Sequence, residues 1–365
     1  MKIPWAKPAF SGKEKKYVLD ALSSTWISDG PYVEKFEEEF LSFLGARYGM
    51  TASNGTAALE LALLALDIGP SDEVVVPGFG FVSAANMVID RRATPVYADI
   101  DPLTWCIDPS EAKKLIAKRT KAIIAVHTYG NVCNMRALKE IAARHKIYLI
   151  EDAAEAAFSK YKNRYAGTWA DIGCFSFQAT KTITTGEGGF ILTADKDLYS
   201  KMRLFRNHGM LPDNKYWHES IGYNFRLSNI QAAMGCAQLE NKENIISERK
   251  KIYSLYKKYL SDEKGIAFQH FPREVDAVVW TVAIKVDPKI FKGGRNFVMK
   301  SLAKAGIETR PGFYPMSVMP LYKAPKLPVS EEVGLNVMAL PTFCGLTEKD
   351  ISFICNRIKK LKKSR

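Results

Sequence analysis

The chain has 365 residues, 47% of them hydrophobic, so it can bury a substantial core and is not a disordered tail. At roughly 150 residues per domain, this length predicts two domains. Lys and Arg number 52 against 39 Asp and Glu, and the net charge of +13 favours acidic partners such as phosphorylated small molecules, nucleic acid or an anionic surface.

Helical patterns occupy the first part of the chain. Ser11 followed three residues later by Glu14 predicts a capping box, and Val18, Leu19 and Leu22 come after it at helical spacing. Apolar side chains then repeat every three or four positions over 33–44, and Gly45 stands where a left-handed C-cap would lie. Two successive helices are therefore expected.

Strand-like runs alternate with helical patterns in the next part of the chain. A helix is predicted over 55–66 and another over 135–145; the strand-like runs are 74–76, 95–98, 122–127 and 148–152. This alternation predicts a parallel sheet covered by helices. Ligands of such sheets collect at the carboxyl ends of the strands, so the segments 79–81, 127–130 and 151–155 are the places to look for chemistry.

The character of the sequence changes near residue 245. A Lys-rich helix over 248–259 precedes shorter strand candidates within 277–286 and a final helix. We therefore expect a large domain over 1–245 and a small C-terminal domain over 246–365.

A small polar turn at 53–57 leads directly into an apolar helix. Free backbone N–H groups and the positive end of the helix dipole converge there, so the turn can hold a phosphate. The alternative is an ordinary cap by Ser53 or Asn54.

Carboxylates end the apolar strand at 148–150. Burying Asp152 is tolerable only beside a cationic or hydrogen-bonding partner, and a protonated heterocyclic nitrogen would serve. A structural helix cap is the alternative for this cluster, 151–155.

Lys181 lies between the strand-like runs 175–177 and 190–193. That placement would hold its amine in the interior crevice of the sheet, where desolvation favours a nucleophilic amine. A lysine flanked by Thr and Gly is otherwise a surface residue. The Gly-rich turn at 184–189 has neither the Walker lysine-serine pair nor the dinucleotide spacing, so it indicates little by itself.

The cysteines and the start of the chain bear on location. Six cysteines without Cys-x-x-Cys spacing indicate neither a zinc cluster nor a disulfide framework, which favours the reducing cytoplasm. No run approaches 18 uncharged apolar residues, and the start lacks a basic stretch followed by an apolar one. We expect neither export nor a membrane span.

Several stretches, in order, resemble the DegT-like family of pyridoxal 5'-phosphate (PLP) aminotransferases that act on nucleotide sugars. They are 26–31, 53–57, 151–155, 176–189, 221–226 and 306–311. The resemblance covers nearly the whole chain. It implies the α/β architecture of fold type I PLP enzymes: a large domain with a mostly parallel central sheet and a smaller C-terminal α/β domain.

The resemblance also implies a role for each matching residue. Lys181 would hold PLP covalently and move a proton between the substrate carbon and the cofactor, and Asp152 would keep the ring nitrogen protonated. The other implied cofactor ligands are Gly55, Thr56 and Ser176 for the phosphate, Phe81 stacked on the ring, Glu155 near the ring hydroxyl, and Asn224 reaching the phosphate from a partner subunit. A homodimer with shared active sites follows from that last role.

Substrates are implied in the same way. Trp26, Ser28, Arg310 and Tyr314 resemble parts of the sugar-nucleotide pocket, and L-glutamate would be the amino donor. Glu155, with 182–189 and 216–218, resembles the branch that aminates GDP-4-keto-6-deoxymannose to GDP-perosamine for surface polysaccharide.

Three positions near the expected substrate depart from the family pattern. Gly80 replaces a threonine, Ser317 a histidine, and Gln178 an aromatic or histidine. They leave UDP- or dTDP-linked ketosugars open as substrates.

Rival classes are less well supported. Related dehydratases carry histidine where Lys181 stands. A non-catalytic PLP-binding regulator would not need Asp152, Lys181 and Ser176 together. A nucleic-acid module would show a helix-turn-helix, zinc finger or aromatic RNA motif, and the sequence contains none.

Overall fold

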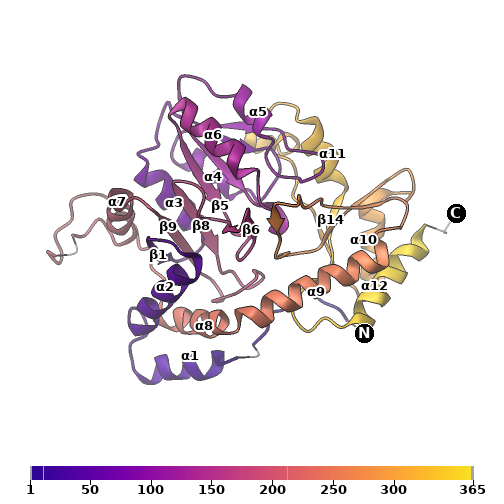
Figure 1. The fold of residues 1–365 in the computed structure, drawn as a ribbon, viewed down its shortest axis with the longest axis horizontal. Coiled ribbons are helices and arrows are strands. Elements are labelled where there is room, and N and C mark those ends of the chain that lie inside the picture. The colour runs from indigo at the N-terminus through magenta and orange to yellow at the C-terminus, as the bar shows by residue number, and fades with distance from the viewer. Residues whose placement is uncertain (1, 11, 212, 363–365) are drawn as a thin grey trace.

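The computed structural model describes residues 2–10, 12–211 and 213–362 (Figure 1). The expected capping residue Ser11 lies outside the described residues. Within them, the central element is a seven-stranded sheet of order β1-β9-β8-β5-β4-β2-β3, in which β9 runs against its neighbours. The strands are β1 (Tyr48–Ala52), β2 (Glu73–Pro77), β3 (Thr94–Ala98), β4 (Thr120–Val126), β5 (Tyr148–Asp152), β8 (Ile172–Ser176) and β9 (Gly189–Thr193).

Helices cover both faces of this sheet because its strands are apolar on both sides. Val75 packs into one core and its neighbours Val74 and Val76 into the other, as the alternation of a strand requires. One core is completed by α2 (Pro31–Leu44), α6 (Met135–His145) and α8 (Asn229–Glu240), and the other by α3 (Gly55–Ala65), α4 (Ser83–Asp90) and α7 (Lys196–Arg206).

The C-terminal part builds a second, antiparallel sheet of order β10-β12-β14-β13. Its strands are β10 (Ile266–Phe268), β12 (Ala283–Val286), β13 (Arg310–Pro311) and β14 (Val337–Ala339), and it shares a core with α9 (Lys242–Leu260), α10 (Gly294–Lys304) and α12 (Glu348–Leu361). The long helix α9 continues from α8 toward this part of the molecule and lies beside α12 (Figure 1). The expected boundary between residues 245 and 246 falls inside α9 and stays a prediction.

Shorter elements connect these units. They are α1 (Glu14–Ser23), α5 (Pro109–Lys114), α11 (Pro328–Asn336), the single-turn helices η1 (Thr128–Gly130), η2 (Met316–Val318) and η3 (Pro320–Tyr322), and a small sheet of β6 (Lys160–Tyr161), β7 (Arg164–Tyr165) and β11 (Val275–Asp276). The N-terminal arm crosses to the C-terminal part, where Ile3 forms a parallel bridge with Ile307. None of the helices in the described part of the chain is long and apolar enough to cross a membrane.

The structure confirms the expected α/β fold and its parallel strands, and it corrects one local expectation. The strand candidate over 277–286 is a strand only from Ala283 to Val286, because the preceding backbone bonds to Tyr129 and Ser159 instead of a neighbouring strand. The first expected helix is present as α1, although Leu19 and Leu22 on it are 50% and 55% exposed. The residues that α1 buries are Glu14 and Ala21.

Candidate active site

A cavity of about 860 Å³ lies where the strands of the central sheet end. It brings together most of the expected site residues: Gly55, Thr56, Phe81, Asp152, Glu155, Ser176, Lys181, Arg310 and Tyr314. Asp152 ends β5 and Ser176 ends β8, so the parallel strands deliver these side chains to one edge of the sheet. Arg310 comes from β13, so the cavity lies between the two sheets.

One end of the cavity is the N-terminus of α3. The N–H groups of Gly55 and Thr56 belong to the first helical turn and have no acceptor within the helix. Asn54 caps the helix by accepting a hydrogen bond from the Ala57 N–H at 2.8 Å. A Cβ at position 55 would lie 2.8 Å from the Cβ of Ser176, so only glycine lets these two segments approach. The expected cap is therefore present, formed by Asn54, and the N–H groups of Gly55 and Thr56 stay available for a phosphate.

Asp152 and Glu151 point in opposite directions, as neighbours on a strand must. Asp152 lines the cavity and accepts a hydrogen bond from the Ala154 N–H at 3.1 Å. Glu151 is fully buried on the other side, where it contacts His127 at 2.9 Å and accepts hydrogen bonds from the N–H groups of Gly167, Trp169 and Ala170. Burial raises the pKa of Asp152, so a cationic ligand beside it would stabilise the charged carboxylate.

Lys181 lies in the loop between β8 and β9, and its side chain is 13% exposed. Its Nζ lies 3.6 Å from Oε1 of Glu155. The other oxygen of Glu155 accepts a hydrogen bond from the Tyr129 N–H at 2.9 Å, whereas Oε1 is buried without a hydrogen-bond partner among the described residues. A buried acceptor of this kind calls for a donor from a ligand.

These residues fit PLP. Gly55, Thr56 and Ser176 offer backbone and hydroxyl donors for its phosphate, Asp152 a carboxylate for its ring nitrogen, and Lys181 the amine that would hold it. The unpartnered Oε1 of Glu155 supplies an acceptor beside that amine. The cavity therefore has a complementary group for each end of the cofactor.

Three expected site residues lie outside the lining of this cavity. Trp26 is 63% exposed, and Ser28 and Asn224 are exposed as well. Asn229 ties the Trp26 segment to α8 by donating to the Trp26 carbonyl at 2.6 Å, and Arg226 donates to Asn224 at 3.1 Å. Within one chain, these side chains stand apart from the other expected site residues.

The three departures from the family pattern lie in different surroundings. Gly80 lines the cavity with a φ of +150°, a conformation that favours glycine and disfavours threonine. Gln178 also lines it, and its side chain accepts hydrogen bonds from the N–H and hydroxyl of Thr180. Ser317 is outside the lining and donates to Glu331 at 2.9 Å.

Sequence reasoning missed three aromatic side chains in the cavity wall: Trp5, Tyr129 and Trp280. Tyr129 and Trp280 stack with ring centroids 6.3 Å apart, and Trp5 meets the edge of Trp280 at 5.8 Å. Only the position of Tyr129 in the sequence could have indicated its role, because it lies in the segment 127–130 that directly follows β4. Trp5 and Trp280 carried no such signal, because they reach the site from the N-terminal arm and from a loop before β12.

Two buried carboxyl groups should make the cofactor-free protein less stable as the pH rises. Burial raises the pKa of Glu155 and of Glu60 to about 7, from an ordinary value of 4.5. Because the folded-state pKa is raised, the stabilisation is complete below 4.5 and is lost as the pH rises through 7.

We expect the unfolding temperature to fall by at least about 2 °C between about pH 5 and pH 8, as measured by circular dichroism. Glu60→Gln and Glu155→Gln should each lessen this fall, because the amide does not titrate. An identical pH dependence of the unfolding temperature in wild type and both variants would show that Glu60 and Glu155 do not cause the fall.

The fold and this set of side chains define a PLP-dependent aminotransferase, an enzyme whose cofactor is pyridoxal 5'-phosphate. The profile of the DegT/DnrJ/EryC1/StrS aminotransferase family matches residues 8–359. The chain belongs to this family.

Named relatives agree with this assignment. The GDP-perosamine synthase of Escherichia coli O157:H7 is 42% identical over 361 residues, which cover 98% of each chain. That of Caulobacter vibrioides is 41% identical over 355 residues, covering 96% of this chain and 95% of the other. Among solved structures, Helicobacter pylori PseC, an aminotransferase involved in the biosynthesis of pseudoaminic acid, is 29% identical with a TM-score of 0.94 over 100% of both chains. The chain is thus a sugar aminotransferase, with a sugar substrate and an amino donor.

Proposed function

We propose that the enzyme transfers the amino group of L-glutamate to C4 of GDP-4-keto-6-deoxymannose and so makes GDP-perosamine for surface polysaccharide such as the O-antigen of lipopolysaccharide. The observation that carries this proposal is the 42% identity to a GDP-perosamine synthase over 98% of the chain. The net charge of +13 also favours a substrate that carries a diphosphate. We place the reaction in the cytoplasm, since all six cysteines are free thiols.

The cavity residues implied by the family resemblance would each have a task in this reaction. PLP, when bound, supplies the electron sink that stabilises negative charge at the substrate carbon. Asp152 would hold a proton at the ring nitrogen, and the first turn of α3 would bind the phosphate. Lys181 would anchor the cofactor, and its Nζ would carry the proton. Glu155 accepts a hydrogen bond beside that amine. These assignments rest on the side chains that line the cavity.

A competition assay tests the substrate. Purified enzyme would be given L-glutamate and equal amounts of GDP-, UDP- and dTDP-linked 4-keto-6-deoxy sugars, and the amino sugars counted by mass spectrometry. We expect the GDP product to dominate. The alternative, a UDP- or dTDP-linked sugar, stays open because Gly80 and Gln178 depart from the family pattern inside the cavity; preference for either nucleotide would overturn the GDP assignment.

Arg310 is our candidate for meeting the diphosphate. Its side chain lines the cavity and is half exposed, with its guanidinium 5.5 Å from the ring centre of Trp5. It also pairs with Glu308 at 2.5 Å, so a purely structural ion pair is the competing role.

We expect Arg310→Ala to raise the KM for the nucleotide sugar by about 10- to 100-fold, since it removes charged hydrogen bonds, and to change the KM for glutamate much less. Steady-state kinetics with each substrate varied would measure both. Glu308→Gln is the control, because it removes the ion pair and keeps the cation. Equal effects of the two variants would assign Arg310 to the structural role.

We further propose a homodimer with shared active sites, in which Asn224, Trp26 and Ser28 reach the partner's cavity. Their exposure supports this, because each is free to contact a second chain. The exposed apolar side chains of Leu19, Leu22, Trp26 and Ile27 offer a surface for such a contact.

Mixing two inactive proteins should then restore activity. In a hybrid of Lys181→Ala and Asn224→Ala chains, one site combines an intact Lys181 with the partner's intact Asn224. After complete subunit exchange, we expect about a quarter of wild-type activity. Lys181→Ala mixed with Asp152→Asn is the control, since each hybrid site would keep one defect. Proven exchange without recovery in the first mixture would contradict the shared site.

A further inference from the structure

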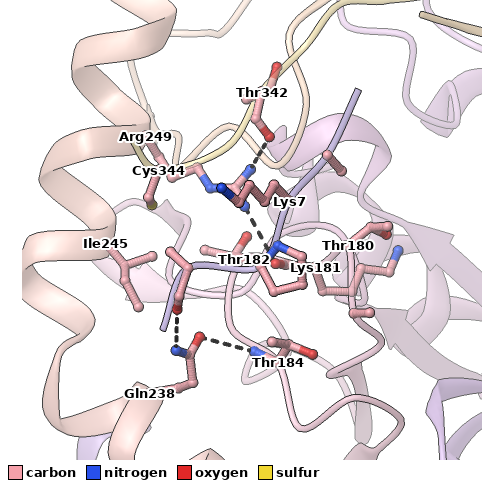
Figure 2. Close-up of a pocket in the computed structure, with 14 residues that line it drawn as sticks. Lys7, Thr180, Lys181, Thr182, Thr184, Gln238, Ile245, Arg249, Thr342 and Cys344 are labelled. Atoms are coloured by element: carbon pink, nitrogen blue, oxygen red, sulfur yellow. Dashed lines mark hydrogen bonds between the residues drawn. The ribbon is translucent and has the colours of Figure 1, made fainter. Parts of the chain in front are cut away.

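Arg249 is a buried cation directly behind the loop that carries Lys181 (Figure 2). It is 5% exposed, and no carboxylate of the described residues pairs with it. Its guanidinium donates instead to three backbone carbonyls: those of Trp280, Thr342 at 3.3 Å and Lys181 at 3.4 Å. Burying a charge is costly unless it is hydrogen-bonded, and the Nε of Arg249 has no hydrogen-bond partner among the described residues. Because the three carbonyls belong to separate segments, the guanidinium ties those segments together.

Trp280 covers the amine of Lys181. The Nζ of Lys181 lies 4.0 Å from the centre of the Trp280 ring. The ring itself is held, because its Nε1 donates to the Thr180 carbonyl at 2.7 Å and the backbone N–H of Trp280 donates to the Tyr129 carbonyl at 3.2 Å. With 6% exposure, the tryptophan has little room to move.

We propose that Arg249 and Trp280 act together as positioning residues for Lys181. Arg249 fixes the backbone of the lysine and that of the tryptophan relative to each other. The Trp280 ring then holds the amine of the lysine when that amine is free and protonated. The inference rests on the proposed catalytic role of Lys181 and is independent of which sugar is the substrate.

Proton transfer by Lys181 requires that its amine be held in a fixed position. Lys181 has a flexible stem, so its released amine needs a fixed place close to the reacting carbon. An aromatic face attracts an ammonium group but cannot take its proton. A proton that Nζ takes from the substrate carbon would therefore stay on the amine and be available for transfer to the cofactor. Without the Trp280 ring, the ammonium would have only Glu155, at 3.6 Å, as a partner, and that carboxylate can accept a proton.

Variants of Trp280 test the role of the ring. The rate of the half-reaction with L-glutamate alone would be followed by visible absorbance, and so would the rate at which cofactor-free protein attaches added PLP. We expect Trp280→Leu to slow the half-reaction by about 10- to 100-fold with little change in the KM for glutamate, and Trp280→Phe to restore most of the rate. Equal rates in the two variants would overturn the proposal for the ring.

Variants of Arg249 test the backbone tie against simple loss of stability. Arg295 is the matched control: it is 3% exposed, and its guanidinium donates to the carbonyls of Gly334 at 2.6 Å and Val337 at 2.9 Å. Arg249→Lys and Arg295→Lys should both lower the unfolding temperature, whereas only Arg249→Lys should slow PLP attachment and the half-reaction. If Arg249→Lys and Arg295→Lys had equal effects on these rates, the role of Arg249 would be structural only.

These outcomes separate the inference from the proposed function. Loss of PLP attachment in Lys181→Ala together with normal rates in Trp280→Leu would overturn the positioning role and leave the function intact. Retained attachment in Lys181→Ala would overturn the role of Lys181 itself. Where Arg249→Lys does not fold, the Trp280 variants decide alone.

Discussion

Replacing Lys181 by alanine should abolish transamination and produce the largest loss of activity of any single substitution in the chain. The substitution removes both the anchor of the cofactor and the group that carries the proton. We expect multiple turnover to fall by at least about 1,000-fold. Borohydride treatment should also fail to fix PLP to the variant, which mass spectrometry of the intact protein would show.

Lys7→Ala is a matched control for this experiment. Lys7 lies on the far side of the Lys181 loop and lines the small cavity behind it (Figure 2). Removing its exposed amine changes the charge by the same amount without reaching the active-site cavity, so activity and borohydride fixation should both persist. Full multiple-turnover activity in Lys181→Ala would show that another group anchors the cofactor.

The carboxyl-edge residues could be predicted from sequence because local patterns determine them. Asp152 follows an apolar run of strand length, and Gly55 opens an apolar helix, so both positions follow from the alternation of strands and helices. Lys181 required the additional resemblance to a family, since a lysine between Thr residues has no distinctive pattern of its own.

The contacts that the C-terminal part and the N-terminal arm make around Lys181 could not be predicted, because tertiary packing creates them. Arg249 lies in a Lys-rich helix, a pattern typical of a solvated face, yet it is buried against the carbonyl of Lys181. Trp280 lies in an apolar run that predicts a strand. Residues from α9, from the loop before β12 and from the N-terminal arm meet only when the C-terminal part folds against the central sheet.

Helix α1 shows a different limit of local patterns. Helical spacing of Leu19 and Leu22 correctly predicts a helix, but it cannot say whether the chain itself covers that face. The exposed leucines leave an apolar surface next to Trp26 and Ile27. The spacing is then consistent with a face buried by a second chain, as the proposed homodimer requires.

Asp152→Asn should leave the fold intact and reduce turnover by about 100- to 1,000-fold. The amide keeps the shape of the side chain and an oxygen for the Ala154 N–H, which Asp152 now binds at 3.1 Å. It cannot balance a positive charge on the ring nitrogen, so that nitrogen would lose its proton and the cofactor much of its capacity to accept electrons. Steady-state kcat at saturating substrates would measure the loss.

The neighbouring carboxylate provides the control for Asp152→Asn. Glu151→Gln also replaces a buried carboxylate on β5 by an amide, but its side chain faces His127 and the backbone N–H groups of residues 167, 169 and 170. That variant should lower the unfolding temperature, because it weakens charged hydrogen bonds in the interior, and keep kcat within a few-fold of wild type. Asp152→Asn should show the reverse pattern, with stability close to wild type and kcat strongly reduced. Wild-type turnover in Asp152→Asn would remove this carboxylate from the mechanism, and equal losses of kcat in both variants would mean that the integrity of β5, rather than charge at the ring nitrogen, limits the reaction.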